Sequence, residues 1–130
     1  MDVEYNKIVK QYSVSYMNNA KWRKIFTAWA KSGIEIAQAE WEFIGTDHKE
    51  FHPLPRENEL MERRFADGQF QPFEYKWILA IRIPQKYKPI SNVGFERKQD
   101  VNSLVDIAKN LGYFPVFETE NGVEIIGYER

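Results

Sequence analysis

The sequence predicts an α+β fold, in which a largely antiparallel sheet of four to five strands carries two helices packed on one face. Three observations indicate this class. Residues 73–83 alternate between two faces as a central strand would, and residues 101–111 repeat apolar side chains at helical spacing. Residues 113–128 form two β-like runs around an Asn-Gly pair, a strong hairpin signal. The strict strand–helix–strand rhythm of a doubly wound fold is missing.

The composition predicts one ordered domain over residues 1–130, because 43% of the side chains are hydrophobic and 15% are aromatic. The chain has no cysteine, which excludes disulfides and thiolate nucleophiles and fits a reducing compartment. No apolar run approaches the roughly 18 residues of a membrane helix. The first residues also lack a signal-peptide pattern. We therefore expect a cytoplasmic protein that does not bind membranes.

The formal net charge of −1 hides four blocks of alternating sign along the chain. Residues 1–31 carry six basic and two acidic side chains, and residues 35–62 carry two basic and eight acidic ones. Residues 63–98 carry eight basic and three acidic side chains, whereas residues 99–130 carry two and six. Such blocks either form local faces for partners or pair with one another in the fold, and we expect pairing.

The first half of the chain contains one well-marked helix and a weaker one. The well-marked helix begins at an asparagine cap, Asn18 or Asn19, and ends before Gly33, where a glycine readily takes the left-handed conformation. Its apolar side chains stand at i, i+3, i+4 and i+7 and are expected to face the core: Trp22, Ile25, Phe26 and Trp29. A shorter helix is expected within residues 1–16, before alternation begins at Val14.

Residues 34–44 predict a strand that places Trp41 and Phe43 on one face and Glu40 and Glu42 on the other. The following stretch, 46–58, is loop-like, with a short strand expected around residues 50–52. Residues 59–66 fit either a helix or a strand. We favour a strand, because a preferred hairpin turn, Asp67-Gly68, follows it and leads into residues 73–83.

The central strand, 73–83, is expected to direct one apolar set into the core: Tyr75, Trp77, Leu79, Ile81 and Ile83. Its second face is polar at the ends and apolar in the middle, which a fully solvated face would not need. An apolar centre with an acidic rim is typical of an interface for a basic partner. We therefore predict a partner-binding face made of Glu40, Glu42, Glu74, Ile78, Ala80 and Arg82, together with Glu118 or Glu124. The alternative is that the N-terminal segment or the 46–58 loop covers this face.

A basic loop, 85–98, follows the central strand, and a second helix follows that loop. Asp100 is the expected cap of the helix at residues 101–111, and Gly112 is its expected end. The loop combines cations with two aromatic side chains, a composition that can hold phosphates and stack bases: Lys86, Lys88, Arg97, Lys98, Tyr87 and Phe95. RNA or DNA binding through this loop is therefore the alternative function, although the pI near 6.1 and the missing motif argue against it.

The sequence gives little support to catalysis or to a metal site. His48 and His52 could share one face of a helix, but Gly45 and Pro53 enclose them and favour a loop or short strand. No Gly-x-Ser-x-Gly elbow surrounds any serine, and each glycine is isolated, so neither a nucleophile nor a phosphate cradle is indicated. We expect no enzymatic activity, no cofactor and no metal.

From Met17 the chain reads Met-Asn-Asn-Ala-Lys-Trp, and it closes near Gly127-Tyr128. In these features it resembles an uncharacterised family of small bacterial proteins that begin with Met-Asn-Asn-x-Lys-Trp and end on Gly-Tyr. That resemblance would cover residues 17–128 and implies no activity. In size, aromatic content and lack of catalytic motifs, the chain is also similar to cytoplasmic immunity proteins, which neutralise bacterial toxins by binding them. We therefore expect a protein-binding module of bacterial type, an immunity or regulatory protein, whose partner is another protein or a second copy of itself.

Overall fold

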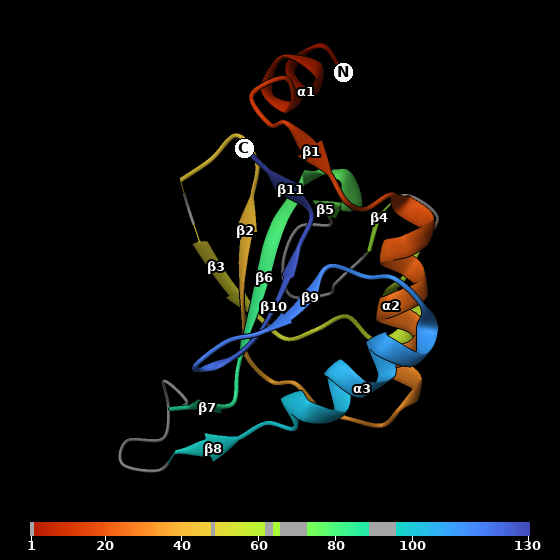
Figure 1. Cartoon of the computed structure of the whole chain (residues 1–130), viewed down its shortest axis with the longest axis vertical. Helices are drawn as coiled ribbons and strands as arrows, with labels where there is room; N and C mark the ends of the chain where they lie inside the picture. The colour runs from red at the N-terminus through yellow and green to blue at the C-terminus, as the bar shows by residue number, and fades with distance from the viewer. Residues whose placement is uncertain (1, 48, 62–63, 66–72, 89–95) are drawn as a thin grey trace.

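The computed structural model describes residues 2–47, 49–61, 64–65, 73–88 and 96–130. A five-stranded sheet forms its centre, with the spatial order β3-β2-β6-β10-β9 and every neighbouring pair antiparallel. Two helices, α2 (Asn19–Lys31) and α3 (Val101–Leu111), lie on the same side of this sheet (Figure 1). The α+β prediction is therefore confirmed. The five strands are β2 (Ala39–Phe43), β3 (Lys49–His52), β6 (Ile78–Pro84), β9 (Val116–Glu118) and β10 (Gly122–Ile126).

Smaller elements surround the sheet. The expected leading helix is α1 (Asp2–Val9), and the alternation after it becomes β1 (Val14–Ser15), which pairs with β11 (Tyr128–Glu129). Two further pairs join β4 (Arg64–Phe65) to β5 (Phe73–Glu74) and β7 (Lys86–Tyr87) to β8 (Arg97–Lys98). Short 3-10 turns occupy Glu57–Glu59 and Tyr75–Trp77. None of the helices in the described ranges is both long and apolar enough to cross a membrane.

The predicted strands agree with the structure to different extents. The strand expected over residues 34–44 is ordered as β2 only from Ala39, whereas the short strand expected around residues 50–52 is present as β3. Residues 64–65 pair with residues 73–74, as the hairpin interpretation required. The Asp67-Gly68 turn of that hairpin lies outside the described residues.

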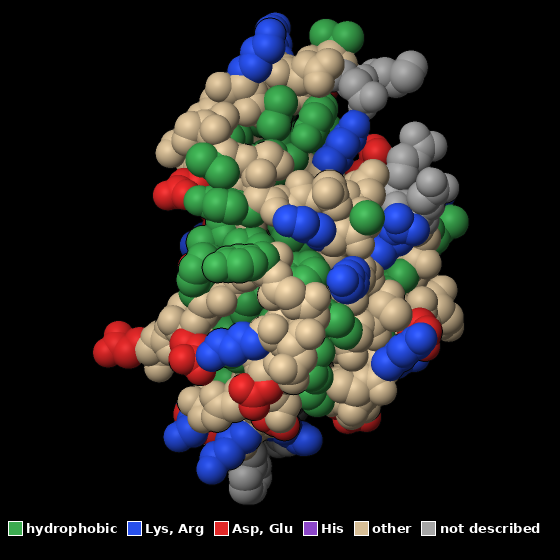
Figure 2. All heavy atoms as spheres, turned by 45° about the vertical axis from the view of Figure 1, so that its right-hand side comes forward, with side chains coloured by type: hydrophobic (Ala, Val, Ile, Leu, Met, Phe, Trp, Pro, Cys, Tyr) green, Lys and Arg blue, Asp and Glu red, His purple; other side chains and the backbone are tan. Residues whose placement is uncertain are grey.

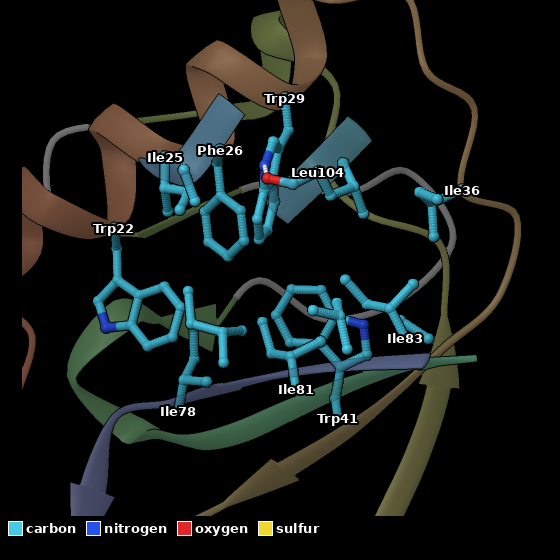
Figure 3. Close-up of a cluster of buried hydrophobic side chains, with 14 of the residues drawn as sticks. Trp22, Ile25, Phe26, Trp29, Ile36, Trp41, Ile78, Ile81, Ile83 and Leu104 are labelled. Carbon is cyan, nitrogen blue, oxygen red and sulfur yellow. Dashed lines mark hydrogen bonds between the residues drawn. The ribbon is translucent and has the colours of Figure 1, made fainter. Parts of the chain in front are cut away.

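The core lies between α2 and the sheet, and α2 follows its sequence signals closely. The Asn18 side chain accepts a hydrogen bond from the Lys21 amide at 2.8 Å, so the helix begins where the cap predicted. All four of its predicted core side chains are buried. Figure 3 shows Trp22, Phe26 and Trp29 reaching from the helix toward the strands, where Ile78, Ile81 and Trp41 meet them. The Trp29 Nε1–H also donates to the Leu104 carbonyl at 3.0 Å and thereby joins α2 to α3.

Residues 73–83 do not form one continuous strand, which corrects the prediction. The 3-10 turn at Tyr75–Trp77 separates β5 from β6. In β6, Leu79 has no partner in β2, because Ala80 pairs with Glu42 and Ile78 already pairs with Phe43. Such an extra residue shifts which side chains face the core. Ile78 consequently faces the core and is fully buried.

Trp77 ends the 3-10 turn and lies away from the centre of the core. Its ring is only partly buried and packs edge-to-face against Tyr5 of α1, with 5.3 Å between ring centroids. Trp41 on β2 takes the central place instead, with no exposed surface. The alternation in the sequence identified a strand here correctly, but it did not show where the alternation restarts.

The C-terminal hairpin is confirmed, with its turn one residue earlier than Asn121-Gly122. Thr119 and Gly122 exchange backbone hydrogen bonds of 2.8 and 3.4 Å, so Glu120 and Asn121 are the central residues of the turn. Gly122 is therefore not a central residue of the turn, and it is needed for close packing instead. A Cβ at this position would lie 2.0 Å from the Ile83 carbonyl oxygen, so only glycine lets β10 approach β6 this closely.

Gln99 is a buried polar residue that the sequence did not single out. Its side-chain oxygen accepts from the Ala37 and Gln38 amides at 2.8 and 3.0 Å. Its amide nitrogen donates to the Gln38 and Pro84 carbonyls at 3.0 and 2.8 Å. One side chain therefore holds the approach to β2, the end of β6 and the start of α3 together.

The charge blocks pair with one another, as expected. Lys31 of the first basic block meets Glu57 of the first acidic block at 3.4 Å. Arg82 of the second basic block contacts Glu40 and Glu124, which come from the two different acidic blocks. The alternating blocks therefore support long-range contacts within the chain.

Candidate functional site

One row of side chains crosses the whole sheet on the face opposite α2 and α3. On one side of Arg82, the strand register pairs it with Glu40 and pairs Glu40 with Phe51. On the other side, the register pairs Arg82 with Glu124 and Glu124 with Phe117. Cross-strand partners of an antiparallel sheet project to the same face. We call this set the transverse row: Phe51, Glu40, Arg82, Glu124 and Phe117.

A shared guanidinium forms the centre of the transverse row. Arg82 Nη1 lies 3.0 Å from Glu40 Oε2 and 2.8 Å from Glu42 Oε1, while Arg82 Nε lies 2.8 Å from Glu124 Oε2. Three carboxylates therefore surround one cation, and the cluster has a net charge of −2 when all four groups are ionised. The Arg82 side chain is still 41% exposed, so the cluster is accessible to a partner.

The electrostatics keep Arg82 charged at any physiological pH. Burial by itself would lower the pKa of Arg82, but the hydrogen bonds to Glu42 and Glu40 and the charge of Glu124 raise it above its usual value. The cluster is therefore a fixed arrangement of charges with an acidic excess.

Exposed phenylalanines form both ends of the transverse row. Phe51 on β3 is 57% exposed, and Phe117 on β9 is 51% exposed. Both lie on edge strands, where soluble proteins usually place charged or short polar side chains to prevent association. The row thus exposes one large aromatic side chain at each edge of the sheet, on either side of the charged cluster.

A hollow of about 550 Å³ lies beside the row and extends toward the β7–β8 hairpin. Glu40, Arg82 and Glu124 line one end of it, and Lys86 and Lys88 line the other. Phe51 and Tyr87 contribute aromatic walls, and the polar groups of Gln38, Thr119 and Asn121 complete the lining. The hollow therefore joins an acidic end to a basic end.

The basic loop predicted from the sequence forms the β7–β8 hairpin. Its register places Lys86 directly opposite Lys98, and Tyr87 opposite Arg97. Like charges in opposite positions destabilise a strand pair. Within the described part of the chain, no ion pair is formed by these cations or by Lys88. Phe95, the second aromatic residue of the predicted loop, lies outside the described residues.

The predicted partner-binding face is only partly assembled. Glu40, Glu42 and Arg82 meet as expected, and Glu124 rather than Glu118 joins them. Ala80 lies on the same face but is only 4% exposed. Ile78 faces the core, because Leu79 shifts the alternation. Glu74 pairs with Arg64 in the separate β4–β5 sheet.

The face is exposed around Arg82 but buried at Ala80, so only part of it is covered, as the alternative proposed for the whole face. Part of the 46–58 stretch becomes β3 and widens the sheet. The N-terminal helix packs elsewhere, where Tyr5 contacts Trp77 and donates or accepts a hydrogen bond with the Tyr128 hydroxyl at 2.6 Å. Phe51 and Phe117 were not among the predicted site residues, because their place in the row depends on the register of the edge strands.

The histidine pair gives no metal site in the described part of the structure. His48 lies outside the described residues, and His52 Nε2 lies 3.1 Å from Glu50 Oε1. Among the residues that are described, no three His, Cys, Asp or Glu side chains gather closely enough to hold an ion.

Comparisons with protein-family models, with curated proteins and with solved structures found no match to this chain.

Proposed function

We propose that this chain is a non-catalytic protein-binding module whose partner docks on the transverse row. The observation that supports this function best is the pair of exposed phenylalanines, Phe51 and Phe117, at the two ends of an accessible charged row. Aromatic side chains are enriched among the residues that dominate binding energy at protein interfaces. The central charges would fix the orientation of the partner and reject partners of the wrong sign.

The dimensions of the row favour a protein over a small ligand. Five strands separated by about 4.8 Å give a row about 19 Å across, from one edge strand to the other. A stable protein interface covers about 800 Å² on each partner, which is a surface roughly 28 Å across. The transverse row and the neighbouring hollow together approach this extent.

The acidic excess around Arg82 favours a basic group on the partner. A cation placed over Glu40 and Glu124 would compensate charge that Arg82 alone leaves unbalanced. A module that binds another protein through a fixed surface suits an immunity or regulatory role, in which occupation of the partner is itself the activity.

A photo-crosslinking experiment tests the proposed surface. Benzoylphenylalanine replaces Phe51 or Phe117, and the chain is irradiated in the cells that naturally produce it. Each position is expected to give the same discrete covalent protein adduct, identified by mass spectrometry. Tyr113 is the matched control, since it is aromatic and 97% exposed but lies outside the row. Equal adducts from all three positions, or none from either row position, would refute the proposal.

Nucleic-acid binding by the β7–β8 hairpin is the second candidate, because four of its cations form no ion pair within the described residues. Figure 2 shows, in contrast, that Lys and Arg side chains on the side carrying α2 and α3 are spread over its full height and form no single track. On this side of the molecule, therefore, no continuous basic track competes with the hairpin.

This second candidate predicts salt-sensitive binding of a 20-nucleotide single-stranded RNA or DNA, measured by fluorescence anisotropy. The expected result is at least tenfold weaker binding when four hairpin cations are reversed: Lys86→Glu, Lys88→Glu, Arg97→Glu and Lys98→Glu. A control with the same change of net charge reverses four exposed lysines elsewhere and should retain more affinity: Lys7→Glu, Lys10→Glu, Lys24→Glu and Lys109→Glu. Equal losses in both variants, or no binding at low salt, would exclude the candidate.

A further inference from the structure

We propose that the surface around the hollow binds a second copy of this chain, in a two-fold symmetric dimer in which the transverse row of each copy faces the β7–β8 hairpin of the other. This inference rests on the proposed function, because it identifies the partner of the same surface. The hollow, its two charged ends and its aromatic walls all contribute to it.

The hollow adjoins two groups of opposite charge. Arg82 and the three carboxylates around it have a net charge of −2, and Glu40, Arg82 and Glu124 of this cluster line the hollow whereas Glu42 lies outside it. Lys86 and Lys88, which line the other end, supply +2. A ligand that spans this hollow must therefore present a basic group at one end and an acidic group at the other.

Opposite charges that line one hollow would be expected to pair within the chain, but these do not. No ion pair joins Lys86 or Lys88 to Glu40 or Glu124. Lys86 and Lys88 therefore keep their charges available to a second molecule, and the Arg82 cluster keeps its acidic excess.

A two-fold axis supplies the matching partner from the chain itself. We place the two-fold axis parallel to the transverse row, through the hollow. Rotation about this axis brings the row of one copy opposite the β7–β8 hairpin of the other copy. Lys86 and Lys88 of each copy then face Glu40 and Glu124 of the other, so each favourable contact is formed twice. Any other partner would need its own surface with the same two charges at the same spacing.

The aromatic walls would provide the apolar centre of this interface. Phe51 and Tyr87 both line the hollow, and more than half of the Phe51 surface is exposed in the single chain. The axis brings these side chains from the two copies into the same buried region. The like-charge pair of Lys86 and Lys98 would gain a nearby acidic cluster, which relieves their repulsion.

Sedimentation equilibrium of the full chain over a range of concentrations tests the dimer. Wild-type protein is expected to show a concentration-dependent mass of two copies, and high salt should weaken the association. Reversal of the hairpin charges by Lys86→Glu and Lys88→Glu should weaken dimerisation at least tenfold. The control Lys7→Glu with Lys10→Glu makes the same change of net charge away from the hollow and should dimerise as the wild type does.

A complementary pair of variants tests the contact itself. A row variant, Glu40→Lys with Glu124→Lys, should be monomeric alone but should form a mixed dimer with the hairpin variant, Lys86→Glu with Lys88→Glu. Should the row variant fail to fold, Phe51→Ser replaces it, and this substitution is expected to weaken the dimer while Tyr113→Ser leaves it unchanged.

The outcomes separate this inference from the proposed function. A wild-type chain that stays monomeric at high concentration, while positions 51 and 117 crosslink a different protein, would overturn the dimer and support the binding module. A dimer that is insensitive to both the hairpin reversal and Phe51→Ser would also overturn it, because the contact would then lie elsewhere. A monomer that gives no crosslink at either position would contradict both proposals.

Discussion

Replacing Trp41 by alanine is expected to lower the free energy of unfolding by about 3 to 5 kcal/mol. Trp41 lies on β2 without exposed surface, between Phe26 of α2 and Phe43 of the same strand, with ring centroids 6.0 and 6.2 Å away. Truncation would remove a large apolar surface and leave a cavity that the surrounding rings cannot fill without moving the helix. Both consequences destabilise the fold.

Trp77→Ala is the matched comparison, since the same side chain is lost from a partly buried position against Tyr5. It should cause a smaller loss of stability than Trp41→Ala. Urea unfolding followed by circular dichroism measures both variants. An equal or larger loss in Trp77→Ala would mean that Trp77 belongs to the core, as the alternation in the sequence predicted, and that β6 is placed incorrectly.

Gln99→Met is expected to cost about 2 to 4 kcal/mol, although it keeps nearly the same volume. The substitution leaves the Ala37 and Gln38 amides and the Pro84 carbonyl without their side-chain partner at partly buried positions. Each hydrogen bond that is lost from a backbone group costs about 1 kcal/mol. The losses add incompletely, because the chain can move slightly to admit water.

Gln85→Met is the control for this prediction, because Gln85 is exposed and its recorded hydrogen bonds use backbone atoms. Its effect should stay within about 0.5 kcal/mol of zero. Hydrogen exchange gives a second readout, in which the Ala37 and Gln38 amides should exchange faster in Gln99→Met than in wild type. Unchanged stability and unchanged exchange at these amides would contradict the role assigned to Gln99.

Several elements could be predicted because their signals are local. Helices α2 and α3 begin at asparagine and aspartate caps, and the Asp100 side chain accepts from the Ser103 amide at 3.1 Å, as its position suggested. Apolar side chains at helical spacing then identified the buried face of each helix. These features depend on residues within one or two turns of each other, which is the range over which sequence spacing is informative.

The candidate site was only partly predictable, because it depends on contacts between strands that are distant in the sequence. Glu40, Glu42 and Arg82 were assigned to one face, since alternation within a strand places them there. Ile78 was assigned wrongly, because Leu79 has no partner in β2 and the alternation restarts. A single unpaired residue changes the face of every side chain beyond it, and its position is determined by packing against a strand more than thirty residues away.

The sequence by itself determined the fold class, the two main helices with their caps, the α2 core face and the acidic character of one sheet face. The tertiary structure alone decided the register of the five strands. That register aligns Phe51, Arg82 and Phe117 in one row and places the β7–β8 hairpin beside it. The tertiary structure also revealed that the Gln99 side chain joins three segments of the chain. Periodicity is encoded in neighbouring residues, whereas register is a property of distant segments packed together.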